Sequence, residues 1–276
     1  MNERKKTLRT VLLNAPYTLW AAIFIVVPLV IVVYYAFTDK EGNFSLSSMA
    51  ELKNFGYIFF ISILYSLIAT AITLIIAYPF AYFMSRRSVN SQRMQVMLVM
   101  LPMWMNLLIR TYSWMNILEK NGVINHILSA LGLPSLTMIG TPGAVILGMI
   151  YNYLPYMILP IYTVMSKIEP SLLEAAEDLG CNGWQKLRRL ILPLSLPGVI
   201  SGIAMVFVPS VSTFYISQKL GGGKIMLVGD IIERQMIANN NYNLGAALSL
   251  VLMVMILISM AVVNRLSDGN DGGIVV

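Results

Sequence analysis

Six long stretches of this sequence contain no Asp, Glu, Lys or Arg, and they constrain the fold more than any other feature. A helix of about 20 apolar residues is enough to cross the hydrocarbon core of a bilayer. The sequence therefore predicts an all-α membrane protein with six transmembrane helices. The uncharged stretches are residues 10–38, 54–85, 94–109, 121–166, 190–218 and 235–264. The predicted spans lie near residues 17–37, 58–84, 94–118, 142–165, 194–215 and 244–263.

Composition supports a membrane location, because 57% of the residues are hydrophobic and only 12% are charged, against about a quarter charged in ordinary soluble domains. A cleaved signal peptide is the alternative for the first stretch. Its apolar part exceeds the usual length of about 7–15 residues, and no small-residue cleavage site precedes Asp39. We expect a retained first helix, a single transmembrane domain over residues 1–276, and a mobile tail at 267–276.

The distribution of Lys and Arg predicts the orientation. With the N-terminus inside, twelve basic residues fall on the inner side and seven on the outer side, which places both termini in the cytoplasm by the positive-inside rule. The charges are split among short loops, which argues against a nucleic-acid surface. The inner set is Arg4, Lys5, Lys6, Arg9, Arg86, Arg87, Arg93, Lys167, Lys186, Arg188, Arg189 and Arg265.

One inner loop, residues 166–193, carries a compact charged segment, EPSLLEAAEDLG. Pro170 suits the first turn of a helix, Gly180 suits its C-terminal cap, and Asn182 suits the cap of a second helix that Pro193 ends at the membrane. Two interpretations are open. The loop is an amphipathic connector on the inner leaflet, or it is a docking element for a soluble partner, with Ala175 and Ala176 allowing close approach.

The residues Glu174-Ala175-Ala176, then Gly180, then Ile191-Leu192-Pro193 resemble the EAA loop of ABC-transporter permeases. In that family the loop sits in a groove of the ATP-binding subunit and transmits its closure to the membrane helices. The resemblance therefore assigns ATPase coupling to the loop. The residues concerned are Glu174, Ala175, Ala176, Glu177, Asp178, Leu179, Gly180 and Pro193.

The resemblance extends over nearly the whole chain, to the permeases of spermidine/putrescine importers and most closely to the first of their two permease subunits. It is carried by segments 101–114, 151–180, 192–202 and 214–232. It implies a type I ABC importer permease (MetI-like) fold in the plasma or inner membrane. The implied partners are a second permease subunit in a heterodimer, two ATP-binding subunits and an extracellular or periplasmic polyamine-binding protein. Related permeases move other small solutes, so an inorganic anion remains an alternative cargo.

The energy source is expected in another polypeptide. A phosphate-binding loop needs the pattern G-x-x-x-x-G-K-[ST]. The segment Gly221–Lys224 fails this pattern, since Gln218 replaces the first glycine and Ile225 follows the lysine. We therefore expect no enzyme activity and no cofactor in this chain, with ATP and Mg used by the partner ATPase. The glycines are better explained as a turn in an outer loop.

Polar and aromatic residues in the outer halves of spans three to five mark a candidate substrate path or outer gate. An aromatic cluster attracts an organic ammonium by about 0.5–2 kcal/mol per contact. The alternative is an interfacial aromatic belt. The candidates are Trp104, Asn106, Arg110, Tyr112, Tyr151, Asn152, Tyr153, Ser210, Phe214, Tyr215 and Asp230.

Arg110 is the difficult member of this set, because a fixed cation would repel a polycation. It either extends to the outer headgroups or pairs with Glu119, Asp230 or Glu233 and shapes the outer gate. An inorganic anion would instead be attracted by it.

Functions from other classes have less support. An integral membrane enzyme needs a constellation of acid, base or metal ligands, and the sequence has no such cluster at useful spacing. A channel or secondary transporter would place more ionisable groups inside its spans. Gly198 and Gly202 form a G-x-x-x-G step that permits close helix packing, at the core of the subunit or at a dimer seam.

Overall fold

The computed structural model describes residues 15–271 and divides them into two compact units. Unit 1 comprises residues 15–56 and 232–254, and unit 2 comprises residues 57–231 and 255–271. The basic residues Arg4, Lys5, Lys6 and Arg9, on which part of the orientation argument depends, lie outside the described residues, as do residues 272–276 of the predicted tail.

Unit 1 is built on two helical spans that pack through small residues. The side chains of Ala36, Ala246 and Ala247 are buried against one another, so the two backbones approach closely. The Asn243 amide donates to the carbonyl oxygens of Thr38 at 2.7 Å and of Tyr35 at 3.2 Å, which satisfies acceptors at the end of the first helix. The elements of this unit are a π-helical turn Ala22–Val26, α2 Val27–Ala36, α3 Ser47–Glu51, the 3₁₀ turn Leu52–Phe55, the π-helical turn Arg234–Ala238 and the first part of α14 Tyr242–Asp271.

Unit 2 is a helical bundle in which α8 and α11 form the closest pair. A Cβ atom on Gly198 would lie 2.8 Å from the Pro160 oxygen, and one on Gly202 would lie 2.6 Å from Met157 Sδ. The G-x-x-x-G step therefore packs inside the subunit. The elements are α4 Gly56–Ser85, α5 Val89–Trp104, α6 Leu107–Leu118, α7 Val123–Ala130, α8 Pro142–Met165, α9 Pro170–Asp178, α10 Gly183–Lys186, the π-helical turn Leu187–Ile191, α11 Leu192–Val211, α12 Tyr215–Leu220 and α13 Val228–Glu233, whose last two residues fall in unit 1.

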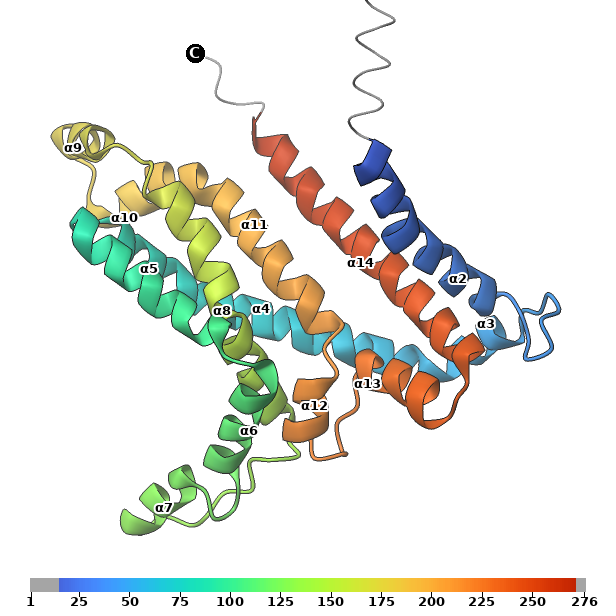
Figure 1. Ribbon diagram of the computed structural model, residues 1–276. Coiled ribbons are helices and arrows are strands. Elements are labelled where there is room, and N and C mark those ends of the chain that lie inside the picture. The colour runs from blue at the N-terminus through green and yellow to red at the C-terminus, as the bar shows by residue number, and fades with distance from the viewer. Residues whose placement is uncertain (1–14, 272–276) are drawn as a thin grey trace, which may run out of the picture. The chain divides into compact units, whose positions relative to one another are not determined.

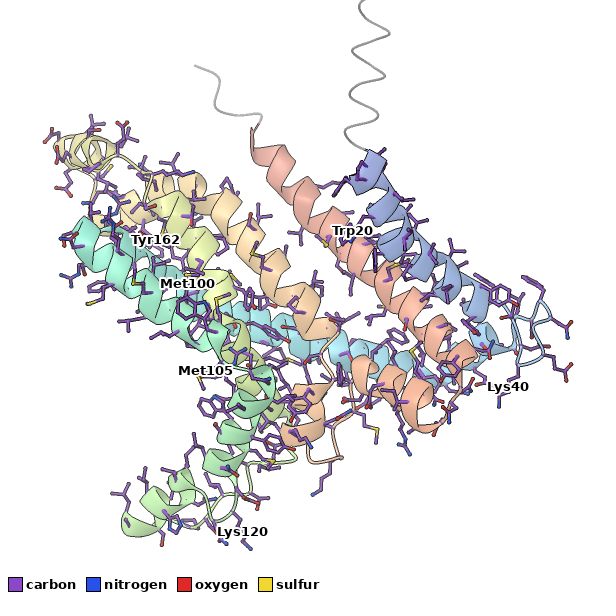
Figure 2. The ribbon with its side chains drawn as sticks, in the orientation of Figure 1. Trp20, Lys40, Met100, Met105, Lys120 and Tyr162 are labelled. Carbon is purple, nitrogen blue, oxygen red and sulfur yellow. The ribbon has the colours of Figure 1, made fainter. Side chains whose placement is uncertain are left out.

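Within the described residues, five helices are long and apolar enough to cross a membrane, and a bent helix pair makes a sixth crossing if it counts as one span. The predicted all-α membrane fold is thus confirmed, and the predicted six spans equal the upper count. The third span differs in form from the prediction, since α5 and α6 meet at 90°. Figure 2 shows Met105 at this corner. Asn106 begins α6 by accepting a hydrogen bond from the Leu108 amide at 2.8 Å, which stabilises a new helix start.

The two ends of unit 2 carry different elements (Figure 1). Helices α9 and α10 lie at one end, and α6, α7 and α12 lie at the other. The end of α14 also differs from expectation in extent, because its helix continues to Asp271 and so includes the first residues of the predicted tail.

Candidate functional site

The EAA loop, residues 166–193, begins with a helix that is closed at both ends by local groups. Pro170 is in the first turn of α9, where its missing N–H costs nothing. At the other end Gly180 has φ +78°, its amide donates to the Glu177 oxygen at 2.8 Å, and the Cys181 amide donates to the Ala176 oxygen at 3.0 Å. This is a Schellman motif, and it confirms the predicted cap at Gly180.

The second helix of the loop starts as predicted but does not end as predicted. The Asn182 side chain accepts from the Gln185 amide at 2.8 Å, and the Gln185 side chain accepts from the Asn182 amide at 2.9 Å, a reciprocal capping box. Pro193, however, does not stop the helix. Residues Gly183–Val211 form one helical segment of 29 residues.

A π-helical turn explains why Pro193 is tolerated. The Leu192 amide donates to the Leu187 oxygen, five residues back, so the regular i to i−4 pattern is already interrupted just before the proline. Proline is accommodated where its missing donor leaves no expected bond broken. The prediction of a stop at Pro193 was wrong for this reason.

The EAA loop presents apolar side chains to its surroundings. Leu179 is 84% exposed and Trp184 is 68% exposed, and Glu174 and Ala175 are also exposed. Lys186 forms an ion pair with Glu177, which links α10 to α9 across the cap. The loop therefore combines a locally fixed backbone with an apolar surface, an arrangement typical of a site that a protein partner covers.

A second anchor of the loop comes from the end of α4. Arg86 donates through Nη1 to the Ile168 oxygen and through Nη2 to the Met165 oxygen, both at 3.3 Å. These carbonyls belong to the end of α8 and the first residues after it, where acceptors lack helical partners and a cation is favoured. The sequence analysis did not single out Arg86 for this role. The feature of the sequence that could have indicated this role is that Arg86 directly follows a long apolar stretch.

At the other end of unit 2, Arg110 is buried in protein. It is 7% exposed, and its Nε and Nη1 atoms have no hydrogen-bond partner among residues 15–271. The first alternative, extension to headgroups, does not describe this buried side chain. The second alternative, pairing with a carboxylate, is not made by these two nitrogens. The guanidinium thus has two buried nitrogens for which the described residues provide no acceptor.

Four aromatic candidates of the predicted path lie in ring pairs. The rings of Tyr112 and Tyr215 have their centroids 6.2 Å apart, those of Trp114 and Tyr151 are 5.2 Å apart, and those of Tyr153 and Tyr156 are 6.4 Å apart. All three pairs meet edge to face, the favoured geometry for aromatic side chains. The Tyr153 hydroxyl also donates to the Pro209 oxygen at 3.2 Å, which ties α8 to the end of α11.

The remaining candidates differ in their hydrogen-bond partners and in their exposure. Asn152 is 1% exposed and donates to the Gly148 oxygen at 2.8 Å, while its Oδ1 has no partner among the described residues. The Ser210 hydroxyl donates to the Val206 oxygen at 2.6 Å, so it is used within its own helix. Trp104 is 74% exposed at the end of α5, and Phe214 is 44% exposed.

Asp230 has a structural contact in the turn before α13. It is 6% exposed, and its Oδ2 accepts from the Leu227 amide at 2.7 Å. The next amide, that of Val228, donates to Ser62 Oγ on α4 at 2.9 Å.

The preceding turn contains Gly222 and Gly223 at φ +55° and +73°, a conformation that glycine adopts without strain. The interpretation of the glycines as a turn is therefore confirmed.

An open pocket of about 570 Å³ lies among α5, α8 and α11. Its wall combines apolar side chains with the polar groups of Tyr156, Thr163 and Ser201. The sequence analysis did not single out these three residues, because each occurs alone within an apolar run. Within the part of the chain that the structure describes, no group of three or more His, Cys, Asp or Glu residues is placed to hold a metal ion.

Comparison with known families decides what kind of protein this geometry belongs to. Residues 93–270 match the family model described as the binding-protein-dependent transport system inner membrane component, which is more than half of the chain. The chain belongs to this family. It is a multi-pass inner-membrane subunit of an ABC importer, a transport permease and not an enzyme, and it works with a separate binding protein.

Individual relatives match over most of the chain. The spermidine/putrescine transport system permease protein PotB of Haemophilus influenzae is 36% identical over 256 residues, 89% of this chain and 90% of that protein. PotB of Escherichia coli is 32% identical over 258 residues, 90% of this chain and 94% of that protein. The inner membrane ABC transporter permease protein YdcU of Escherichia coli is 34% identical over 215 residues, 72% of this chain and 68% of that protein.

Two solved structures share the fold. A chain of a bacterial ABC transporter for the import of the acidic polysaccharide alginate matches with a TM-score of 0.78 at 20% identity, over 97% of this chain and 99% of that chain. A second alginate transporter structure, in complex with an alginate-bound periplasmic protein, matches with a TM-score of 0.76 at 18% identity, over 96% of this chain and 95% of that chain. These likenesses show the permease fold that the resemblance implied.

Proposed function

We propose that this chain is one of two membrane-spanning permease subunits of an importer for spermidine and putrescine. The observation that carries this proposal is the match over about 90% of the chain to permeases of spermidine/putrescine transport systems. Paired rings at the α6–α12 end support it, because aromatic faces attract ammonium groups.

In this proposal the EAA loop docks on the ATP-binding subunits. The exposed Leu179 and Trp184 provide apolar contact area, and Glu174 provides a charge at its edge. The partners are a second permease subunit in a heterodimer, two ATP-binding subunits that use ATP and Mg, and an extracellular or periplasmic polyamine-binding protein. Both termini lie in the cytoplasm, so the EAA loop faces the ATPase and the α12 end faces the binding protein.

Transport then follows from alternating access. The docked binding protein and ATP favour the outward-open form, and hydrolysis returns the inward-open form. A ligand shifts such an equilibrium only through its different affinities for the two forms. The chain itself supplies the path and the docking loop.

The test is uptake of radiolabelled spermidine and putrescine into proteoliposomes that contain this chain with its partner subunits and binding protein. Wild type should import both in an ATP-dependent manner. Glu174→Arg should abolish ATPase co-purification and reduce uptake at least about tenfold, equivalent to about 1.4 kcal/mol of lost coupling. The same charge reversal at the exposed Glu41 of unit 1 is the control and should leave both unchanged.

A second cargo class, a small inorganic anion, is favoured by one observation, the buried Arg110 whose Nε and Nη1 lack partners. Guanidinium groups bind oxyanions through such donors. Uptake of phosphate or sulfate without uptake of polyamine would replace our proposal with this one, while loss of the ATPase in Glu174→Arg would still support the docking role of the loop.

A further inference from the structure

At the α6–α12 end, the ammonium group of Lys219 lies close to two aromatic rings, those of Tyr112 and Tyr215. Lys219 Nζ lies 5.2 Å from the centroid of the Tyr112 ring and 5.7 Å from that of Tyr215. The two rings meet edge to face at an interplanar angle of 74°. Both distances are within the range of about 6 Å over which a ring attracts a cation.

The surrounding helices hold this arrangement in place. Tyr215 and Lys219 are four residues apart on α12 and so share one face. Ile216 and Leu220, on the adjacent face of α12, are buried. They pack where α8 has Gly148, since a Cβ there would lie 2.4 Å from Leu220 Cδ1 and 2.8 Å from Ile216 Cγ2. Because Gly148 has no side chain, α12 packs close to α8. This packing fixes the orientation of the α12 face that carries Tyr215 and Lys219.

The environment of Lys219 differs from that of the other cations near rings. Arg86 lies over Tyr82 and Arg87 over Phe83, in each case a single ring four residues earlier, at the end of α4. Lys219 lies near two rings from two different elements. Among the side chains that the structure describes, Lys219 forms no ion pair. The two tyrosine side chains are the groups placed against its ammonium group.

We propose that Tyr112 and Tyr215 form a binding subsite for a primary ammonium group of the transported substrate, and that Lys219 is a tethered competitor that the substrate displaces. The inference rests on the proposed polyamine function. Because Lys219 is covalently attached, its ammonium has a high effective concentration at the rings. It therefore raises the substrate concentration needed to fill the subsite, and it keeps the rings occupied when no substrate is present.

The test measures KM for spermidine with the complete transporter in proteoliposomes. Lys219→Met should lower KM about fivefold, which corresponds to about 1 kcal/mol, because the competitor is gone. Lys219→Arg retains a cation that can lie over the rings and should keep KM near the wild-type value. Lys224→Met removes the same charge from an exposed position in the adjacent turn and should leave KM unchanged.

A double-mutant cycle separates competition from simple charge repulsion. With Tyr112→Leu the subsite is incomplete, so a further Lys219→Met change should no longer lower KM. An equal fall of KM in both backgrounds would show that Lys219 merely repels the polycation, and it would overturn the proposal.

A labelling experiment on wild type tests displacement without any substitution. Because spermidine also consumes acetic anhydride, the reagent is kept in excess over all amines and the acetylation of Lys219 is measured relative to that of Lys224 by mass spectrometry. Spermidine should increase this ratio. An unchanged or decreased ratio in a transporter that imports spermidine would overturn the inference alone. Failure of wild type to import any polyamine would instead overturn the proposed function, and the inference with it.

Discussion

The two ends of unit 2 satisfy their polar groups in opposite ways. In the EAA loop the helix ends are closed by neighbours in sequence, through Gly180 and Asn182, while large apolar side chains are exposed. At the α6–α12 end, by contrast, polar atoms of Arg110 and Asn152 are buried without partners among the described residues. An unpaired buried polar group costs about 1–3 kcal/mol. The EAA loop thus exposes apolar side chains on a locally closed backbone, whereas the α6–α12 end buries polar atoms for which the described residues provide no partner.

The largest effect is expected from breaking the cap of the EAA loop. Gly180→Val places a β-branched residue at φ +78°, which costs roughly 1–2 kcal/mol and reorients α9 against α10. We expect near-complete loss of ATPase co-purification and of uptake. The melting temperature of the membrane bundle, measured by tryptophan fluorescence in detergent, should change little.

Gly183→Ala is the matched control for this change. Gly183 is only three residues further along, and an added Cβ meets no atom within 4 Å. It should co-purify with the ATPase as wild type does. Loss of the ATPase in both variants would mean that the loop tolerates no substitution, and the argument from the cap would fail.

A smaller effect is expected from replacing Arg110, which should stabilise the isolated subunit where most substitutions of buried residues destabilise it. Because two of its nitrogens are buried without partners, Arg110→Leu should raise the melting temperature of the isolated subunit by a few degrees, as expected from a gain of about 1 kcal/mol. Transport by the assembled complex should fall about tenfold. Arg265→Leu, at an exposed position, should alter neither. A lower melting temperature for Arg110→Leu would contradict the view that this end is incomplete.

The smallest effect is expected from the capping box. Asn182→Ala removes one acceptor at the start of α10 and should cost about 1 kcal/mol. Hydrogen exchange of the amides of residues 183–186 should accelerate about fivefold, and uptake should fall by no more than about threefold. Asn90→Ala, at an exposed position in α5, is the control. Unchanged exchange would show that tertiary contacts hold α10.

The sequence predicted those structural features that depend on residues adjacent in the chain or on long stretches of apolar residues. The six spans follow from uncharged stretches, and the caps at Gly180 and Asn182 follow from the turn chemistry of single residues. The corner between α5 and α6 was missed, although Asn106 is a good helix-capping residue. An apolar run that is hydrophobic on all sides gives no signal for a change of direction.

The site was less predictable because its contacts join residues distant in sequence. Lys219 was counted only as an outer charge, and nothing near it in the sequence indicates that Tyr112 lies beside it. Nothing in the sequence indicated that Asp230 accepts a hydrogen bond from the Leu227 amide, while its predicted contact with substrate stays a prediction. Pro193 was read from its usual effect on helices, which the π-helical turn before it removes.

That turn has a mechanical consequence. Because α10 passes into α11 without a loop, the proposed docking surface and a membrane-spanning helix are parts of one segment of 29 residues. At 1.5 Å per residue this segment is about 43 Å long, so a tilt of about 5° at one end would displace the other by about 4 Å. If the segment moves as one rigid helix, the ratio between the displacement of its α10 end and that of its other end depends on the point along α11 about which it pivots.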